Sequence, residues 1–282
     1  MKVLPFKIPK PEHATFIFQK DTDSIFYDKL HQHEEIQLSL IVEGQGTLII
    51  GDTINYYNAG DILIIGSNLP HVFKSDIKAS ETSEMLTLFF TETSFGEHFF
   101  HLEPLKEAAS FFKRSKYGFK IKSNKKQLRK LFKRLENNTK FNQFLLFLKI
   151  LKLCSTANYT SLSSFLYNKK YSENEGKRLR DVFEYTMTHF EQNISLDSVS
   201  SIANMTKNAF CKYFKKRTNK TYFQFLTELR VEHACKLLIH NKELHITEIA
   251  YQSGFKNISN FNRQFKLLKQ ATPSDFRNNK GI

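Results

Sequence analysis

The chain has 282 residues, of which 40% are hydrophobic and 25% charged, and this length and composition suit a soluble protein of two domains. The first twelve residues have no apolar stretch of the kind found in secretory signals, and the most apolar run, residues 144–153, is too short to span a bilayer. We therefore expect a cytoplasmic protein with no membrane partner, whose three widely spaced cysteines stay reduced.

The net charge of +14 is unevenly distributed along the chain. Residues 1–100 hold 7 basic against 14 acidic side chains, residues 101–177 hold 18 against 5, and residues 178–282 hold 17 against 9. An acidic front half joined to a basic back half indicates that the back half meets a polyanion. Lysine runs that only solvate helices would give the same totals, so charge alone leaves both interpretations open.

The first hundred residues have the pattern of short strands. β-branched and aliphatic runs at residues 38–42, 47–50 and 62–65 are separated by glycine-containing turns. Short, evenly spaced strands of this kind indicate an antiparallel sandwich or barrel, which we assign to residues 1–102.

From about residue 103 the apolar spacing becomes helical. Leu128, Leu131, Phe132 and Leu135 form one stripe, and a second helix, from about residue 141 to 154, is apolar nearly all round. We assign residues 103–177 to a helical connector and dimerisation region. We expect one face of the second helix to cover the barrel with Phe141, Phe144, Leu145 and Leu148. The other face, with Phe147, Ile150 and Leu151, would then pair with a second copy in a homodimer. The alternative is that its own domain covers this helix completely.

The last segment, residues 178–282, contains one pattern twice. Val199-Ser200, Asn204, Phe210 and Phe214 recur as Ile249-Ala250, Gly254, Phe261 and Phe265, at an offset of 50 to 51 residues. Each copy is a short helix, a tight turn and a second helix, as in a helix-turn-helix. We expect positive φ at Asn204 and Gly254, N-caps at Thr206 and Asn257, a buried stripe of phenylalanines in each unit, and one long helix of about 18 residues between the units.

Three stretches in this segment resemble the DNA-binding domain of the AraC/XylS family of transcription regulators. They are LTELRVEHACKLL, ITEIAYQSGF and TPSDFR, and the resemblance covers roughly residues 180–278. The first unit departs from the family pattern, since Ser200 stands where the family usually has Ala and Asn204 where it usually has Gly. Strands followed by a helical connector also look like family members with a cupin-type sensor. The expected fold is thus α+β: an N-terminal antiparallel cupin-like β-barrel with connecting helices, then an all-α domain of two helix-turn-helix units.

The resemblance implies which residues read DNA. The recognition helices would span residues 206–217 and 257–269. The residues at the family's base-contacting positions are Asn208, Ala209, Cys211, Lys212, Ile258, Ser259, Asn262 and Arg263. Arg pairs with guanine, Asn with adenine, and Ile or Ala touches a thymine methyl group. The basic residues better suited to phosphate contacts are Lys207, Lys215, Lys216, Arg217, Lys256 and Lys266.

In the front half, HQH and GDILIIGSNLPH resemble the two cupin motifs. A metal-binding cupin has Glu three or four residues after its second His, where this chain has Gln37 and Leu38. Three histidines can still bind a divalent ion. Because the carboxylate is missing, we assign no metal and no cofactor, and we expect His31, His33 and His71 to hydrogen-bond a small polar ligand in the barrel.

Together these observations predict a ligand-responsive, dimeric transcription regulator that binds double-stranded DNA. By resemblance it would be an activator that works with RNA polymerase and responds to a small polar effector such as a sugar. We do not expect an enzyme. One alternative is a metal-dependent cupin enzyme fused to a DNA-binding domain, and another is an architectural DNA-binding protein without a ligand.

Overall fold

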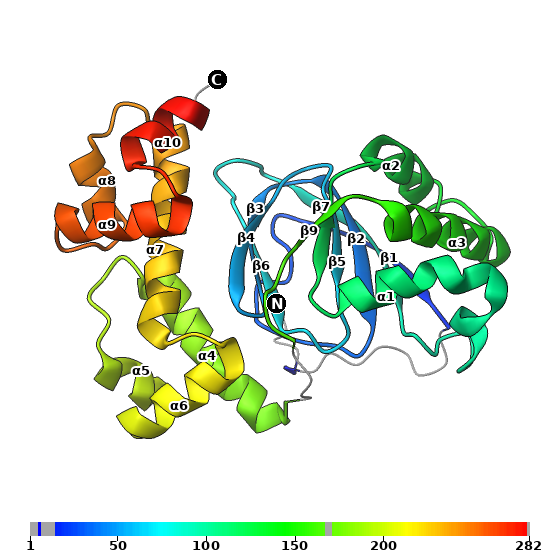
Figure 1. Cartoon of the computed structure of the whole chain (residues 1–282), viewed down its shortest axis with the longest axis horizontal. Helices are drawn as coiled ribbons and strands as arrows, with labels where there is room; N and C mark the ends of the chain where they lie inside the picture. Colours follow the sequence, from blue (N-terminus) through cyan, green and yellow to red (C-terminus); the bar gives the residue numbers. More distant parts are fainter. Residues whose placement is uncertain (1–4, 7–14, 167–170, 281–282) are drawn as a thin grey trace. The chain divides into compact units, whose positions relative to one another are not determined.

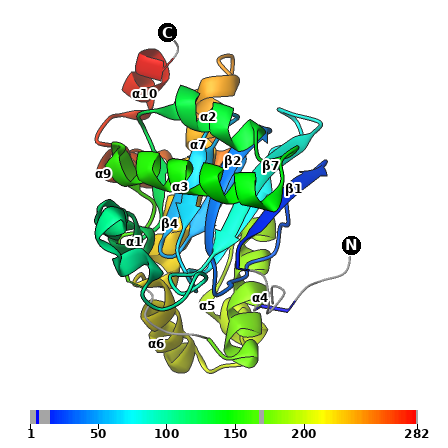
Figure 2. The same cartoon turned by 90° about the vertical axis from the view of Figure 1, so that its right-hand side faces the viewer.

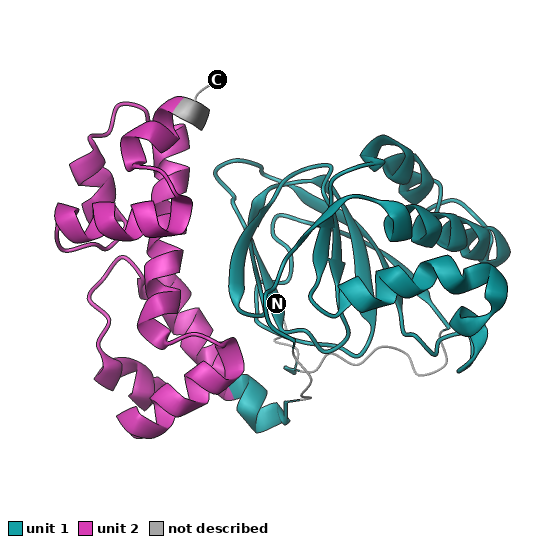
Figure 3. Cartoon of the chain, viewed as in Figure 1, with its two compact units in different colours: residues 1–177 teal, residues 178–282 magenta. Residues whose placement is uncertain are grey.

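The computed structural model describes residues 5–6, 15–166 and 171–280. The chain separates into two compact units, residues 1–177 and residues 178–282 (Figure 1, Figure 3). Unit 1 carries every described strand, and unit 2 is helical. Within the described ranges, no helix combines the length and the apolar character that a membrane crossing requires.

Unit 1 is built on two antiparallel sheets, which confirms the predicted antiparallel β domain. A six-stranded sheet has the order β1-β7-β2-β5-β8-β9, and a three-stranded sheet has the order β4-β3-β6. An isolated bridge pairs His31, which lies outside the strands, with His71 at the start of β6. The strands are β1 (Ile17–Asp23), β2 (Ile36–Glu43), β3 (Gly46–Ile50), β4 (Thr53–Tyr57), β5 (Ile62–Ile65), β6 (His71–Ser75), β7 (Ser83–Phe90), β8 (Phe119–Ile121) and β9 (Tyr159–Ser161).

The central strands of the large sheet are buried on both faces, because a core lies on each side. Ile62 and Ile64 of β5 belong to a core shared with the helices of unit 1, whereas Leu63 and Ile65 belong to a core shared with the small sheet. Strands covered on both faces have continuous apolar sequences instead of alternating ones, as ILII in β5 does. The interior of the barrel is therefore lined only by alternate residues of each strand.

Helices cover the outer face of the large sheet. Figure 2 shows α3 lying across this face, with α1 and α2 beside it. The segment that the sequence predicts as purely helical also contributes β8, which pairs with β5, and β9, which pairs with β8. Strands of three residues are too short to show a period of two. The helical elements are η1 (Phe99–His101), η2 (Glu103–Ala108), α1 (Ala109–Ser115), α2 (Lys125–Lys133) and α3 (Lys140–Thr156).

The predicted faces of α3 are wrong. Phe147 and Ile150 are fully buried and Leu151 is 2% exposed, whereas Phe141 is 70% and Leu145 is 41% exposed. The side chains expected at a dimer interface therefore form the domain core, and two of those expected in the core face solvent. The reason lies in the aromatic packing around Phe147, whose ring contacts those of Phe16, Phe90, Phe95 and Phe100.

An ion cluster joins the turn before β5 to the helical layer. Asp61 accepts hydrogen bonds from Lys120 of β8 and from Lys125 of α2, the latter at 2.9 Å. Burial alone would raise the pKa of Asp61, but these two ammonium groups hold it below its usual value. The carbonyl of the neighbouring Gly60 accepts from the guanidinium of Arg129 in α2 at 2.9 Å. The edge of the barrel and α2 are thus connected by charged hydrogen bonds.

Unit 2 contains the two predicted helix-turn-helix units, α5-α6 and α8-α9. Asn204 and Gly254 lie in the turns with φ of 50° and 84°, as predicted. The predicted N-caps are confirmed, because the side chains of Thr206 and Asn257 accept hydrogen bonds from the third backbone N–H of the helices that they begin. The helices are α4 (Glu173–His189), α5 (Leu196–Ile202), α6 (Lys207–Thr218), α7 (Tyr222–His240), α8 (Ile246–Gln252), α9 (Ile258–Lys269) and α10 (Pro273–Lys280).

The long helix α7 packs into both helix-turn-helix units. At its N-terminal end, the rings of Tyr222 and Phe225 contact Phe214 of α6. At its C-terminal end, Cys235 and Leu238 share a core with Phe261 and Phe265 of α9. As predicted, the phenylalanine stripes of α6 and α9 are buried, with Phe210, Phe214, Phe261 and Phe265 all at 0% exposure. Because α7 is part of both cores, it holds the two helix-turn-helix units of unit 2 in one arrangement.

The turn residues of the two helix-turn-helix units, Asn204 and Gly254, differ in how well they should tolerate substitution. This difference gives a test of the repeat. A methyl group on Gly254 would lie 2.6 Å from the carbonyl oxygen of Phe190 and 2.8 Å from Nε of Arg230, at a positive φ. We expect Gly254→Ala to lower the free energy of unfolding by about 1–3 kcal/mol. Asn204→Gly is the matched control in the first unit and should change it by less than about 0.5 kcal/mol, since Asn already adopts this conformation. Chemical denaturation of both variants measures the difference, and equal effects would contradict this account.

Candidate DNA-binding surface and ligand pocket

The buried stripe of each recognition helix determines which side chains face outward. In α6, Phe210 and Phe214 pack inward, and in α9, Phe261 and Phe265 do so. Of the residues proposed to contact bases, all but one are exposed: Asn208, Ala209, Cys211, Lys212, Ser259, Asn262 and Arg263. Ile258 is half-buried against the core of the second unit. Each helix therefore presents a solvent-facing side with side chains that can hydrogen-bond a base edge.

No role was predicted for Asn260, which lies beside Arg263 on α9. Its side-chain oxygen accepts a hydrogen bond from the guanidinium of Arg263 at 3.1 Å, and its own backbone N–H is capped by Asn257 at 2.7 Å. Asn260 is thus placed to orient the arginine head group. A polar residue three positions before an arginine on a helix was the available signal, because residues at this spacing are neighbours on the helix surface.

All five lysines expected to contact phosphate face solvent. Lys207, Lys215, Lys216, Lys256 and Lys266 are exposed. Lys207 forms an exposed ion pair with Asp197 of α5 at 2.7 Å, which a phosphate can replace at small cost. The expectation for Arg217 is wrong. This residue is 8% exposed, and its guanidinium lies 4.8 Å from the centre of the Tyr213 ring, so it packs within the unit.

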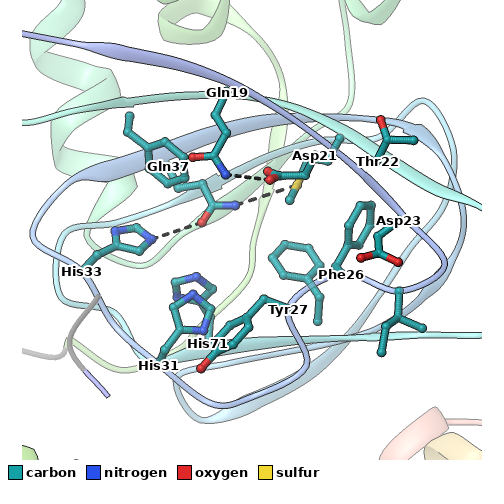
Figure 4. A pocket seen from close by; sticks show the side chains of 14 residues that line it. Gln19, Asp21, Thr22, Asp23, Phe26, Tyr27, His31, His33, Gln37 and His71 are labelled. Atoms are coloured by element: carbon teal, nitrogen blue, oxygen red, sulfur yellow. Dashed lines mark hydrogen bonds between the residues drawn. The ribbon is translucent and has the colours of Figure 1, made fainter. Parts of the chain in front are cut away.

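Unit 1 has a cavity of about 300 Å³ in the barrel interior, at the lower end of the range for small-molecule sites. It is lined by the three predicted histidines together with polar residues of β1 and β2 (Figure 4). Gln19, Asp21 and Asp23 of β1 alternate along the strand and so share one face. The amide of Gln19 donates to Asp21 at 2.6 Å. This alternation of polar residues was a readable signal for the pocket that the sequence analysis missed.

His31, His33 and His71 come together in the structure. All three are buried, and one ring nitrogen of each lies within 4.8 Å of the others. The ring centres of His31 and His71 are 4.2 Å apart, and the ring of Tyr27 meets that of His31 edge to face at 5.0 Å. The backbone bridge between residues 31 and 71 holds two of the rings side by side.

A polar network continues from the histidines into the interior. His33 Nε2 lies 3.2 Å from Oε1 of Gln37, whose amide nitrogen donates to the hydroxyl of Ser39 at 3.0 Å. Ser39 pairs in turn with Thr87 of β7 at 2.8 Å. These groups stand on the inward faces of strands whose other faces are apolar. The sequence pattern identifies such residues poorly, because a polar residue that faces the pocket gives the same alternation as one that faces solvent.

Two helix-turn-helix units in a basic domain, joined to a domain with a ligand-sized cavity, define a DNA-binding transcription regulator. The comparisons agree with this class. A family model described as an AraC-like ligand binding domain matches residues 14–88, and one described as a helix-turn-helix domain matches residues 199–279. The chain therefore combines an AraC-like ligand binding domain with a helix-turn-helix domain, the two parts of an AraC-type transcription regulator.

Known relatives extend over different parts of the chain. The uncharacterized HTH-type transcriptional regulator YdeC of Bacillus subtilis is 24% identical over 263 residues, covering 89% of this chain and 86% of the relative. An uncharacterized HTH-type transcriptional regulator of Staphylococcus aureus is 30% identical over 111 residues, which is 39% of this chain but only 15% of that protein. The solved C-terminal domain of AraT, a response regulator from Geobacillus stearothermophilus, is 28% identical over 37% of this chain and 87% of its own, with a TM-score of 0.36.

Proposed function

We propose that this chain is a ligand-responsive, dimeric regulator that activates transcription by reading the major groove with α6 and α9. The observation that carries the proposal is the pair of recognition helices, each capped, each buried along a phenylalanine stripe, and each exposed along its polar side. Both recognition helices pack on one continuous helix, α7, which supports contact with successive major grooves as in other helix-turn-helix proteins. A DNA-binding activator works in the cytoplasm together with RNA polymerase.

The proposed contacts divide into two kinds. Arg263 and Asn262 on α9, and Asn208 on α6, carry the head groups that pair with guanine or adenine. Ala209 and the half-buried Ile258 offer methyl groups to thymine, and Cys211, Lys212 and Ser259 complete the base-facing set. The exposed lysines at positions 207, 215, 216, 256 and 266 bind phosphates, which adds affinity without sequence preference.

The barrel is the proposed sensor. Its cavity suits a small polar effector such as a sugar, with His31, His33 and His71 as hydrogen-bonding groups on one side and the acidic β1 residues on another. If the effector binds the barrel more tightly when the connecting helices have one arrangement, it increases the population of that arrangement. No chemical step is needed. We assign sensing to residues 1–102, connection and dimerisation to residues 103–177, and DNA binding to residues 178–282. The ion cluster around Asp61 offers a route from the barrel to α2.

The proposed dimer uses the face of α3 that the structure leaves open. Phe141 and Leu145 are exposed there, and Leu102 is 51% exposed in the segment before η2. Burying an aliphatic or aromatic side chain of this size is worth about 1.5–3 kcal/mol, so a second copy paired about a two-fold axis would gain from covering them.

The DNA contacts are tested by a pair of substitutions on α9. We expect Arg263→Ala to cost about 1–3 kcal/mol on the selected operator and to relax the preference at one base pair. Lys266→Ala should weaken operator and random DNA by similar factors, because a phosphate contact carries no base information. The operator is first obtained by selection from random duplexes with the full chain, and affinities are then measured by fluorescence anisotropy. If both variants lose the same factor on operator and random DNA, the assignment of Arg263 to a base is wrong.

A further inference from the structure

Unit 1 has a second cleft, at the place where the edge strands of its two sheets lie beside α1. β4 is an edge of the small sheet, and β9 is an edge of the large one. The cleft has a volume of about 650 Å³ and shares no described lining residue with the barrel cavity. Two cations of α1, Lys113 and Arg114, line it, and none of its described lining residues is acidic. The cleft is therefore positively charged, although the first hundred residues of this unit are acidic in sum.

Arg114 is fixed in the wall of this cleft by four hydrogen bonds. Its Nε and Nη2 donate to the carbonyl oxygen and the hydroxyl of Ser110, at 2.9 and 2.8 Å. Nη1 and Nη2 donate to the carbonyl oxygens of Ala157 and Ser155 at the C-terminal end of α3, the former at 3.2 Å. The guanidinium also lies 4.8 Å from the centre of the Tyr159 ring. Since a guanidinium has five N–H groups, one of them, on Nη1, is left for a ligand of the cleft.

Three further polar groups of the cleft have no partner among the described residues. Lys113 is exposed and makes no hydrogen bond or ion pair there, and the hydroxyl groups of Tyr117 and Ser161 make no hydrogen bond. An ammonium group only donates, and its hydrogen bonds are strongest when the acceptor is negatively charged. These groups, together with the free N–H of Arg114, therefore suit a ligand that carries a negative charge and several acceptor oxygens.

The opposite side of the cleft is formed by residues 159–164, which we call the wall segment. Its end is tied to the turn between β3 and β4 by Asp52, which is 2% exposed. The carboxylate of Asp52 accepts hydrogen bonds from the hydroxyl of Ser163 at 2.7 Å and from the backbone N–H of Ser164 at 3.0 Å. The wall segment precedes the connection to unit 2, which begins at Arg178. A ligand that contacts both α1 and the wall segment holds this part of the chain in place.

We propose that this cleft binds a small organic anion rich in hydroxyl groups, and that the bound anion stabilises the wall segment. Sugar phosphates and sugar acids share this chemistry. The charged group of the anion lies at Lys113 and the free N–H of Arg114, and its hydroxyl groups reach Tyr117 and Ser161. The barrel cavity, lined by Asp21 and other acidic residues of β1, repels such an anion. The cleft therefore gives the regulator a second input that is independent of the barrel.

Isothermal titration calorimetry of the full chain tests the proposal with glucose 6-phosphate, gluconate and glucose, in a buffer free of phosphate and carboxylates. We expect saturable one-to-one binding of at least one of the two anions, and the anion that binds identifies the acidic group. Hydrogen exchange measured by mass spectrometry then locates the site. The bound anion should slow exchange in residues 159–164 and leave β1 unchanged, whereas glucose, which lacks the charge, should not protect the wall segment.

Two matched pairs of variants separate the cleft from the rest of the surface. Lys113→Gln should weaken binding of the anion by about tenfold or more, because it removes a charged donor. Lys116→Gln changes an exposed lysine that does not line the cleft and should bind as the wild type does. Ser161→Asp places a negative charge in the cleft and should abolish binding. Thr160→Asp places the same charge on the other face of β9 and should leave binding unchanged.

The proposal is overturned if neither anion binds, if glucose protects the wall segment as well as the anions do, or if protection appears in β1 instead of residues 159–164. Equal affinity in Lys113→Gln and Lys116→Gln also overturns it. None of these results bears on the selection of an operator by the full chain, so a failure of this inference and a failure of the proposed function are distinguishable.

Discussion

A fragment of residues 178–282 is expected to fold alone and to bind duplex DNA with an affinity that falls about 500-fold between 50 and 200 mM salt. The fragment is a compact unit with 17 basic against 9 acidic residues. Five exposed lysines are proposed to contact phosphate, and each phosphate neutralised contributes about −0.9 to the slope of log affinity against log salt. Five contacts give a slope near −4.5, which corresponds to about this factor for a fourfold change in salt.

Fluorescence anisotropy with a labelled duplex, repeated across the salt range, measures the slope. The double variant Lys215→Gln with Lys216→Gln should reduce its magnitude by about 2, because two phosphate contacts are removed. Glu243→Gln serves as a control, since it changes an exposed charge outside both recognition helices. A folded fragment that shows no binding at low salt, or a slope near zero, would contradict the assignment of the basic surface.

Ile150→Glu is expected to unfold unit 1. Ile150 is fully buried in the core between α3 and the large sheet. The substitution removes about 1.5–3 kcal/mol of apolar burial and places a carboxylate where it has no water, at several kcal/mol more. Their sum is comparable with the total stability of a domain, about 5–15 kcal/mol. Circular dichroism and thermal unfolding of the full chain should therefore show the loss of the β domain while the helical unit remains.

The matched control lies on the other face of the same helix. Leu145 is 41% exposed, so Leu145→Glu should change the free energy of unfolding by less than about 0.5 kcal/mol. If the proposed dimer uses this face, Leu145→Glu with Phe141→Glu makes the protein monomeric in sedimentation equilibrium and leaves it folded. An Ile150→Glu protein with a normal melting transition would show that α3 packs differently.

The difference between these two positions could not be obtained from the sequence. In α3, apolar residues occupy nearly every position from 144 to 151, so a period of 3.6 selects no single buried face. The choice depends on the aromatic rings that surround Phe147, which are distant in sequence: Phe16 just before β1, Phe90 of β7 and Phe95 before η1. By contrast, the stripe of Leu128, Phe132 and Leu135 could be predicted because charged residues separate its members.

The helix-turn-helix units were the most predictable part of the chain for a related reason. The same order of turn, cap and phenylalanines occurs twice, with four residues from cap to first phenylalanine in both copies, so each copy supports the interpretation of the other. The exception is Arg217, whose position at the end of a basic run suggested a phosphate contact. Its burial follows from the ring of Tyr213 one turn earlier, and an arginine after an aromatic residue at this spacing is compatible with either outcome.

The pocket was only partly predictable. The three histidines were found because they stand in two short motifs, but the other polar residues of the pocket come from β1 and β2. On β1 the alternation of Gln19, Asp21 and Asp23 marks the face that they share, whereas on β2 nothing in the local sequence marks the inward face. Gln37 is the clearest case. In the sequence it counts as a missing carboxylate, whereas in the structure its amide oxygen lies 3.2 Å from His33.

Because α7 is packed into the cores of both helix-turn-helix units, the two DNA half-sites that this protein binds should have one fixed spacing. One extra base pair between two half-sites moves the second by about 3.4 Å and turns it by about 35° around the duplex axis. A flexible tether would absorb this displacement, but a continuous helix of 19 residues, packed at both ends, would not. Target promoters should therefore share one ungapped pattern in which the two half-sites never vary in separation, and a single position-weight matrix, without alternative spacings, is enough to find them.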